Sequence, residues 1–503
     1  MTATRKLWPL LLAAAAGCAG VSGRGPATDS PPPVVQREMR GLWVATVANI
    51  DWPSRKGLTA REQQAELIGI LDKAAKTGFN TIVFQVRPAA DALYASPLEP
   101  WAAWLSGNQG EHPGYDPLAF AIAESHARGM QLHAWINPFR AGNTADTAKL
   151  APGHVFNTRR DLVRVYGGNL WMDPGDPAAQ ERSIDVIRDI VTRYDIDGMH
   201  ADDYFYPYQV RDSAANGFLQ FPDDSTWARH GGGMSRDDWR RANIDRFVER
   251  MYREVHAIKP GVVVGISPFG IWRPGYPASV SGLDAYASIY ADSRKWLQRG
   301  WVDYFVPQLY WAIGAPQQSF PVLLDWWIGE NAARRHVWPG LATYRVANGT
   351  PTAFSLEEIP TQIRLTRDRL REPGEIHFNT KAALERLDAT VRATLERDLY
   401  GTRAIVPAYP WLDSIAPAVP RISVSDGTLR IAMDANDPAR WWLVRAHLPA
   451  RRSWRGRKPA AWSTRLEFAG SSSIVIDPST DRLVVQAIDQ AGNASAPVEW
   501  RKP

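Results

Sequence analysis

Cysteine is almost absent from this sequence of 503 residues, which contains only Cys18. A single cysteine excludes an internal disulfide and any metal site built from several cysteine ligands. The sequence also lacks an HExxH segment or a comparable spacing of metal-ligating side chains. We therefore predict no metal site and no other cofactor, and a metal held by His and Asp is the less favoured alternative.

A strong excess of charge of one sign is also missing. The formal net charge is +5, from 58 Lys and Arg against 53 Asp and Glu. The cations are spread along the chain, with one local run over residues 451–458. Because binding to the phosphates of nucleic acid requires clustered cations, we predict no nucleic-acid partner.

Long apolar runs are absent as well, apart from a short one near the start. Residues 7–16 are apolar and follow Arg5 and Lys6, and a run of about ten residues is a signal-peptide core rather than a membrane span. The run ends in Ala15-Ala16-Gly17-Cys18, similar to the cleavage box of bacterial lipoproteins, although Ala15 stands where Leu is preferred. We predict a signal peptide over residues 1–18 and lipidation of Cys18. A plain signal peptide with an incidental cysteine is the alternative.

The residues after the cysteine indicate how the protein is held. Ala19 stands where Asp would be expected in a lipoprotein retained at the inner membrane, so we predict an anchor in the outer membrane, facing the periplasm. Residues 19–36 are rich in Gly, Ser and Pro and read as a flexible tether. The lipidated Cys18 is thus the predicted contact with the membrane.

From Glu38 onward, short β-rich runs alternate with amphipathic helical patterns. The expected strands are 42–47, 81–87, 131–137, 198–204, 262–268, 302–310, 336–343 and 375–379. The expected helices are 60–77, 117–128, 177–194, 236–258, 285–299, 321–334, 356–371 and 381–399. Eight such pairs predict a (β/α)₈ barrel over residues 37–400. A doubly wound open sheet is the alternative, but it usually has a Gly-rich turn after its first strand, and residues 49–53 contain no Gly.

The helical patterns stop after Tyr400. Residues 404–503 contain short alternating strands with turns at Asp426-Gly427 and at residues 491–493. Such spacing predicts a small β-sandwich, separated from the barrel by the Pro-rich residues 406–411.

The polar residues of the barrel gather where strands end, which is where barrel enzymes place their chemistry. The most informative of them are Asp202 and Asp203, because two adjacent carboxylates at the end of a buried strand are costly to desolvate. Strand parity predicts that Asp202 points into the barrel mouth with His200, and that Asp203 points toward a neighbouring loop. The alternative is a structural pair that caps a turn and binds an arginine.

Other strand-end residues complete the expected site. Parity directs Arg87, His133, Trp135 and Asn137 into the barrel, and Arg87 and Arg140 are the expected counter-charges of the Asp pair. His133 and His200 either bind substrate or are satisfied core histidines. The full set of predicted substrate-binding residues is Arg87, Asp91, His133, Trp135, Asn137, Arg140, Asp173, His200, Tyr204, Gln308, Tyr310, Trp311 and Tyr344.

The composition of this set suits a sugar. The 22 Trp exceed both the 16 Tyr and the 15 Phe, and pyranose rings pack their C–H faces on indole. Glycoside cleavage requires a carboxylate and a second acid that protonates the leaving oxygen. Asp202 or Asp203 supplies the first. For the second we rank Glu111 before Asp91, although Glu111 could be an ordinary solvated loop residue.

Several separated motifs resemble one family. They are residues 37–44, 84–88, 113–118, 133–138 and 197–207, which last segment reads Asp-Gly-Met-His-Ala-Asp-Asp-Tyr-Phe-Tyr-Pro. Together they resemble the bacterial glycosyl-hydrolase-like family ten over about residues 36–400, with Ala201 where that family often has Phe. The resemblance implies a (β/α)₈ barrel, and one characterised relative implies cleavage of peptidoglycan strands stripped of stem peptides. Residues 487–495 are similar to the final strand of fibronectin type III modules.

The expected function follows from the leader, the Asp pair, the aromatic residues and the resemblance. We predict a glycosidase that cuts amino-sugar glycan strands of the bacterial cell wall, with Asp202, Asp203 and Glu111 as catalytic residues. A non-catalytic wall-binding lipoprotein is the alternative, because no Glu ends the fifth or sixth strand. The C-terminal domain is expected to position the enzyme or to bind glycan or a partner protein.

Overall fold

The computed structural model describes residues 30–503 except 214–215, 435, 437 and 454–455. The predicted signal peptide and Cys18 lie outside the described residues. No helix in the described part of the chain combines the length and apolarity that a membrane crossing requires.

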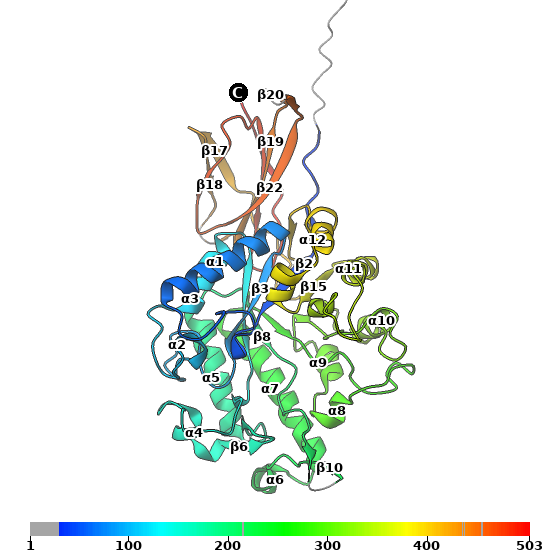
Figure 1. Ribbon diagram of the computed structural model, residues 1–503. Helices are drawn as coiled ribbons and strands as arrows, with labels where there is room; N and C mark the ends of the chain where they lie inside the picture. The colour runs from blue at the N-terminus through cyan, green and yellow to red at the C-terminus, as the bar shows by residue number, and fades with distance from the viewer. Residues whose placement is uncertain (1–29, 214–215, 435, 437, 454–455) are drawn as a thin grey trace, which may run out of the picture.

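A closed parallel barrel forms the larger part of the molecule (Figure 1). Its strands pair in the order β13-β12-β11-β8-β4-β3-β2-β15-β14. Their bounds are β2 (Met39–Val44), β3 (Thr81–Arg87), β4 (Gln131–Ile136), β8 (Gly198–Ala201), β11 (Val263–Ile266), β12 (Tyr304–Phe305), β13 (His336–Val337), β14 (Gly340–Leu341) and β15 (Gly374–His377). β13 and β14 are two halves of one strand, interrupted at Pro339, whose missing amide hydrogen cannot join the ladder. The nine segments therefore make up eight barrel strands, and the predicted (β/α)₈ barrel is confirmed.

Helices surround the barrel (Figure 1). The larger ones are α1 (Ala60–Thr77), α3 (Pro117–His126), α5 (Pro177–Arg193), α7 (Arg236–Ile258), α9 (Ser293–Arg299), α10 (Phe320–Glu330) and α11 (Glu358–Arg369). Local sequence sets their ends. α1 begins in a capping box between Thr59 and Glu62 and ends at Gly78, which has a left-handed backbone.

Two expected helices are divided. The pattern over 285–299 forms α8 (Ala285–Ser288) and α9, because Tyr290 between them has a positive φ of 57°. The pattern over 381–399 forms α12 (Ala389–Thr394) flanked by π-helical turns over Ala382–Arg386 and Leu395–Leu399. Both changes lie on the outer layer and leave the strand order intact.

Strand parity separates two cores. The barrel interior is filled by Trp43, Val83, Trp135, Tyr304 and Trp338, which belong to one buried cluster. The alternate residues of the same strands, with the inner faces of the helices, form the larger cluster between the barrel and the helices. Val83 and Trp135 thus point inward as parity predicts.

The C-terminal part is all-β. It contains one three-stranded sheet, β17 (Arg421–Ser425), β18 (Thr428–Ala432) and β23 (Ser473–Val475), and one four-stranded sheet, β22 (Ala461–Phe468), β19 (Trp441–Leu448), β24 (Arg482–Ile488) and β25 (Val498–Arg501). A short hairpin, β20 (Arg451–Ser453) and β21 (Gly456–Lys458), follows β19. The two main sheets share a buried apolar cluster that includes Leu429, Val444 and Leu483.

This domain packs on the end of the barrel where the parallel strands begin (Figure 1). Arg440 binds Asp197, the residue just before β8, with guanidinium-to-carboxylate distances of 2.7 and 2.9 Å. Phe468 stacks on His126 of α3 at 4.5 Å between ring centroids. The all-β domain therefore lies opposite the carboxyl ends of the strands.

The first described residues leave the barrel at the same end. β1 (Gln36–Arg37) pairs in parallel with β16 (Ala404–Ile405), which joins the barrel to the all-β domain. The carbonyl oxygens of Pro33 and Ser30 accept hydrogen bonds from Arg445 and Trp462.

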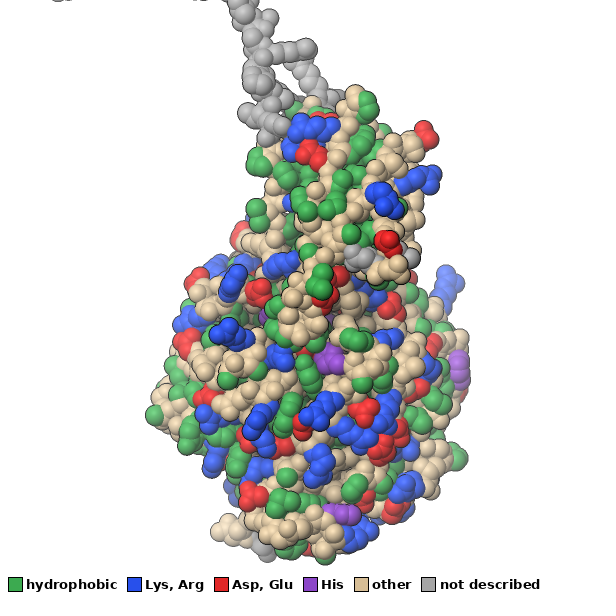
Figure 2. All heavy atoms as spheres, turned by 180° about the vertical axis from the view of Figure 1, so that it is seen from behind, with side chains coloured by type: hydrophobic (Ala, Val, Ile, Leu, Met, Phe, Trp, Pro, Cys, Tyr) green, Lys and Arg blue, Asp and Glu red, His purple; other side chains and the backbone are tan. Residues whose placement is uncertain are grey.

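On the face shown in Figure 2, acidic and basic side chains are interspersed over the barrel.

Candidate active site

A cleft of about 350 Å³ opens at the carboxyl ends of the barrel strands. Its lining residues come from most of the strands and the loops that follow them. They are Trp43, Ala45, Val47, Ile50, Gln85, Trp135, Arg140, Asp202, Asp203, Tyr204, Tyr208, Ser267, Gln308, Tyr310 and Phe378. The Asp pair supplies all the carboxylates in this set.

Asp202 is held at the end of β8 by two N–H donors. The Asn137 side-chain amide donates to Oδ2 at 2.9 Å, and the backbone N–H of Asp203 donates to Oδ1 at 2.9 Å. Only 8% of Asp202 is exposed. Both carboxylate oxygens of Asp202 are thus fixed in direction by hydrogen bonds.

A relay of amides fixes the donor in turn. Gln85 Nε2 donates to Asn137 Oδ1 at 2.7 Å, while Gln85 Oε1 accepts from the backbone N–H groups of Thr46 and Val47, each at 2.9 Å. These bonds determine that Asn137 turns its NH₂ group toward Asp202. Asn137 is therefore a support of the carboxylate rather than part of the cleft lining.

Asp203 lies in the same cleft, where its charged form is disfavoured. Burial, and then the adjacent Asp202 carboxylate, raise the pKa of Asp203 well above its usual range. The Tyr208 hydroxyl donates a hydrogen bond to Asp203 Oδ2 and partly offsets this rise in pKa. The pair thus combines a carboxylate held by N–H donors with a neighbour that favours its protonated form.

The predicted separation of the two side chains by parity is wrong. β8 ends at Ala201, and beyond that residue the chain leaves the sheet, so alternation no longer directs Asp203 away from the barrel mouth. Both carboxyls line one cleft.

The two histidines lie beneath the cleft, inside the barrel. His133 and His200 both contact the Tyr304 hydroxyl through Nδ1, at 2.8 and 3.0 Å. Both side chains are fully buried, and burial lowers the pKa of His133 to about 4 and that of His200 well below its usual range. His133 and His200 are therefore neutral core residues, and the prediction that they bind substrate is not supported by their position. His200 does support the floor through Ser267 Oγ at 3.0 Å.

The expected counter-charges pair elsewhere. Arg87 is fully buried and binds Glu99 through two hydrogen bonds of 2.6 and 2.8 Å, so it neutralises that carboxylate rather than the Asp pair. Arg140 does line the cleft, where its guanidinium donates to the Tyr204 hydroxyl and lies 4.8 Å from the Tyr204 ring centroid. The prediction that Arg87 is a counter-charge of the Asp pair is therefore wrong. No signal in the sequence identified Glu99 as its partner.

Neither predicted proton donor on the second loop reaches the cleft. Glu111 is exposed and accepts from the Asn108 side chain at 3.0 Å, outside the residues that line the cleft. Asp91 is buried and lines a second cavity of about 360 Å³, and burial raises its pKa to about 7. Residues of this loop, including residues of α2 (Ala103–Ser106), line the second cavity, and none of them lines the cleft.

The second cavity adjoins the first along the chain. Arg140 lines the cleft, and residues 141–144 line the second cavity together with Lys56, Trp104 and Lys149. The Lys56 ammonium lies 4.3 Å from the Trp104 ring centroid. Aromatic, amide and cationic groups thus continue beyond the cleft.

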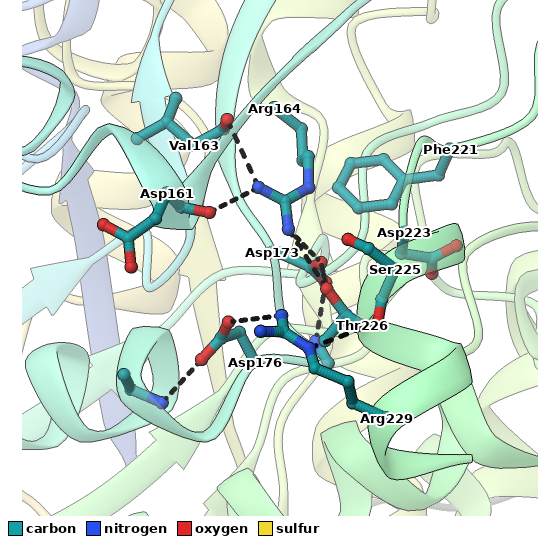
Figure 3. Close-up of polar contacts among 12 residues, drawn as sticks. Asp161, Val163, Arg164, Asp173, Asp176, Phe221, Asp223, Ser225, Thr226 and Arg229 are labelled. Atoms are coloured by element: carbon teal, nitrogen blue, oxygen red, sulfur yellow. Dashed lines mark hydrogen bonds and ion pairs between the residues drawn. The ribbon is translucent and has the colours of Figure 1, made fainter.

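Asp173 belongs to a structural network (Figure 3). Its carboxylate accepts from Thr226 Oγ1 at 2.6 Å, Arg164 at 3.1 Å and the backbone N–H of Gly175 at 2.9 Å. Asp173 is fully buried and ties the segment before α5 to α6 (Asp224–His230). The prediction that it binds substrate is not supported by this position.

Aromatic side chains make up one wall of the site. Tyr310 stacks on Phe378 at 6.1 Å between centroids, and Tyr344 meets both rings edge-on. Tyr204, Gln308 and Trp135 line the cleft as expected. Trp311 is half-buried and packs on Phe269, one ring removed from Tyr208 of the cleft lining.

Eight lining residues are not among the predicted site residues: Trp43, Ala45, Val47, Ile50, Gln85, Tyr208, Ser267 and Phe378. Trp43 and Phe378 follow the parity of their strands, and each could have been found by extending the inward pattern to the first and last strands. Ser267 follows the last residue of β11 (Val263–Ile266), a strand-end position of the kind expected to carry the site. Tyr208 had no local signal, because its contact with Asp203 depends on the path of the following loop.

Among the described residues, no group of three or more His, Cys, Asp or Glu side chains is arranged to hold a metal ion. The cleft lining offers two carboxyl groups, tyrosine hydroxyls and side-chain amides.

Comparison with known proteins identifies the family of this chain. The family model described as Glycosyl hydrolase-like 10 matches residues 38–354. Glycosyl hydrolase YngK of Bacillus subtilis (strain 168) is 41% identical over 397 residues, covering 77% of this chain and 76% of that protein. Glycosyl hydrolase DigH of Escherichia coli (strain K12) is 37% identical over 346 residues, covering 64% and 77%. Among solved structures, the catalytic domain of β-amylase from Paenibacillus polymyxa aligns with a TM-score of 0.49 at 11% identity, over 73% of this chain and 99% of that one. The family match and the two relatives show that this chain belongs to the glycosyl hydrolase-like 10 family.

Proposed function

We propose that the protein hydrolyses β-linked amino-sugar glycan strands of the bacterial cell wall. The observation that carries this proposal is the Asp202–Asp203 pair in the cleft at the carboxyl end of β8. One carboxyl is held by N–H donors and its neighbour favours the protonated form, and glycoside cleavage needs both a negative charge and a proton donor. The aromatic wall of Tyr310 and Phe378 provides flat surfaces for sugar rings.

Peptidoglycan strands without stem peptides are the proposed substrate. In such strands each N-acetylmuramic acid carries a free carboxylate. The second cavity contains Lys56 and Lys149, whose charges complement that group, and it also contains Asp91 and Asp146. Because burial raises the pKa of Asp91 to about 7, its negative charge is suppressed below neutral pH and opposes an anionic substrate less.

The proposed location is the outer membrane, through lipidated Cys18. The distance from Cys18 to Ser30 is at most about 40 Å for a fully extended chain. Ser30 lies against Trp462 of the all-β domain, at the end of the molecule opposite the cleft. A membrane anchor at this end leaves the cleft open toward the cell wall.

The all-β domain is proposed to be a fibronectin type III-like module. Its sheets, β17-β18-β23 and β22-β19-β24-β25, have the three-plus-four strand arrangement of that class. Because it packs on the far end of the barrel, we propose that it positions the enzyme or binds glycan or a partner protein, and contributes no catalytic group.

The test uses purified protein with peptide-free and peptide-bearing glycan strands, with products identified by mass. We expect shorter strands that have gained one water for each cut, formed faster from the peptide-free substrate. The double variant Asp202→Asn/Asp203→Asn, with unchanged melting, controls for a contaminating hydrolase. If no strand is cut but the wild type still binds glycan, the protein is the wall-binding lipoprotein and the hydrolase proposal fails.

A further inference from the structure

The two carboxyl groups are too close together for the usual arrangement of a glycosidase. In the common mechanisms the two groups flank the sugar, about 5–5.5 Å apart when configuration is retained and about 6.5–9.5 Å apart when it is inverted. Here the Asp202 and Asp203 side chains are in hydrogen-bond contact with each other, and the backbone N–H of Asp203 also donates to the Asp202 carboxylate at 2.9 Å. Neighbours on one strand end cannot stand on opposite faces of one sugar ring.

A partner carboxylate on the opposite face is not present in the described cleft lining. Asp202 and Asp203 are the carboxylates among the lining residues. Asp91 lies in the second cavity, and Glu111 is exposed and bound to Asn108. Asp173 is fixed by Thr226 and Arg164. The group that attacks the sugar carbon must therefore come from the substrate or from water.

Resting on the proposed function, we propose that the substrate supplies its own nucleophile. The cleft binds a 2-acetamido sugar whose carbonyl oxygen attacks C1, Asp203 protonates the leaving oxygen, and Asp202 accepts a hydrogen bond from the acetamido N–H. The acetamido carbonyl oxygen itself reaches the face opposite the leaving oxygen. Asp202 needs to reach only the N–H on C2, at the edge of the ring next to C1, so the two protein carboxyls can act from neighbouring positions. Such substrate-assisted cleavage is a known exception to the two-carboxylate rule.

The steps balance without another reactant. In the first step the bond from the acetamido oxygen to C1 forms, the bond from C1 to the glycosidic oxygen breaks, and the Asp203 proton moves to that oxygen. In the second step water gives a proton to the Asp203 carboxylate while its oxygen bonds to C1, and the bond from C1 to the acetamido oxygen breaks, which restores the acetamido group. Two displacements at C1 leave its configuration retained.

The surroundings of the two carboxyls match these roles. Asp202 is anchored by Asn137 and the Asp203 amide, which keeps its charge directed at a fixed point, as the positively charged intermediate requires. The raised pKa of Asp203 keeps a proton available for transfer, and the Tyr208 hydroxyl supports the carboxylate that this transfer creates. Trp43, Tyr310 and Phe378 provide apolar surface for the acetyl methyl group.

The first experiment compares peptide-free glycan strands whose amino groups carry acetyl, trifluoroacetyl or no acyl group. Fluorine withdraws electrons from the carbonyl oxygen, and the free amine has no carbonyl, so we expect kcat/KM to fall at least about 100-fold for both. Nuclear magnetic resonance of fresh products should show retained configuration. Inversion, or cleavage of all three strands within a few-fold, would overturn the inference while leaving the hydrolase intact. Failure to cut the acetylated strand would reject the hydrolase itself.

The second experiment separates the roles of the two carboxyls. With acetylated oligosaccharides that carry either a sugar or an activated phenol as leaving group, Asp203→Asn should slow release of the sugar by about 100-fold or more and release of the phenol much less. Asp202→Asn should slow release of the sugar and of the phenol alike, because the Asp202 carboxylate is proposed to bind the attacking acetamido group. Glu111→Gln removes an exposed carboxyl outside the cleft and serves as the matched control, with activity near that of the wild type. Equal losses of Asp203→Asn on both leaving groups would contradict its role as the proton donor.

Discussion

The two ends of β8 carry aspartates with opposite environments. At its beginning, burial disfavours the charge of Asp197, but Arg440 and His126 outweigh this effect and lower its pKa. At its end, burial and Asp202 raise the pKa of Asp203. Asp197 is fully partnered and joins two domains, whereas Asp203 faces a cleft. The four residues of β8 thus separate a carboxylate with a structural role, Asp197, from one proposed to take part in catalysis, Asp203. Both are buried, so their opposite pKa shifts come from their different partners.

The largest effect is expected for removal of the negative charge in the cleft. Asp202→Asn keeps the shape of the side chain but removes the charge that stabilises a positively charged sugar. We expect kcat/KM on glycan strands to fall by about 10²–10³, which corresponds to about 3–4 kcal/mol, with little change in melting temperature. Activity within a few-fold of the wild type would place the chemistry elsewhere.

The next effect concerns the structural end of the strand. Arg440→Ala leaves Asp197 buried without its cation, and breaking such a pair costs about 3 kcal/mol or more in the free energy of unfolding. Since the lowered pKa of Asp197 stabilises the folded state above its unfolded pKa of about 3.9, the loss should be complete near pH 7 and shrink as the pH falls below about 4. Denaturant titration of the wild type and of Arg440→Ala, near pH 7 and below about pH 4, measures this loss in the free energy of unfolding.

Removal of the all-β domain tests whether the end of the barrel opposite the cleft contributes to catalysis. Val406 and Tyr409 belong to the buried cluster of the barrel, so a chain ended near Tyr400 would lose part of that cluster. A chain ended after Asp413 keeps it. We expect this shorter protein, if folded, to cut a short soluble glycan within a few-fold of the full chain. Complete loss of activity in a folded protein would contradict the separation of the two ends.

A smaller effect is expected at Asp91. Its pKa of about 7 lies above the unfolded value of about 3.9, so its contribution to stability is full at low pH and is lost as the pH rises through 7. The melting temperature of Asp91→Asn relative to the wild type should therefore rise between pH 4 and pH 8, by about 2 °C or more. A difference that does not change with pH would contradict a raised pKa.

The smallest effect is expected for Tyr208→Phe. The Tyr208 hydroxyl supports the Asp203 carboxylate and so lowers its pKa, and its removal should raise that pKa further. If Asp203 acts as the proton donor, activity falls as the pH rises through its pKa. The alkaline limb of kcat/KM should therefore move to higher pH in the variant, with a few-fold change in rate at neutral pH. A limb that stays in place or moves to lower pH would contradict the assignment.

Regular parts of the molecule could be predicted from the sequence, because they depend on local patterns. The bounds of α1 and α7 and of β3 agree with the expected ranges, and parity placed Val83 and Trp135 inside the barrel. These features depend on capping residues and on alternation within a strand, both of which are visible in the residues themselves.

Residues on loops and in ion pairs could not be predicted in the same way. Glu111 is the first-ranked proton donor of the sequence analysis, but its loop is held by contacts with no local signal, such as the bond from the Gly110 N–H to the Trp101 carbonyl at 2.8 Å. Asp203 was directed away from the cleft because parity was extended beyond the last paired residue of β8. Arg87 was assigned to the Asp pair because its real partner, Glu99, is buried twelve positions away without a local signal.

The most direct test of the account compares Asp203→Asn with Asp197→Asn. Each variant removes one buried carboxylate next to β8, Asp197 before the strand and Asp203 after it. Both variants are measured for cleavage of peptide-free glycan strands and for the free energy of unfolding. The account predicts that Asp203→Asn loses about 10² or more of the cleavage rate and keeps its stability, whereas Asp197→Asn is destabilised and its folded fraction cuts glycan at nearly the normal rate. Retained cleavage by Asp203→Asn, or equal losses of activity and stability in the two variants, would contradict it.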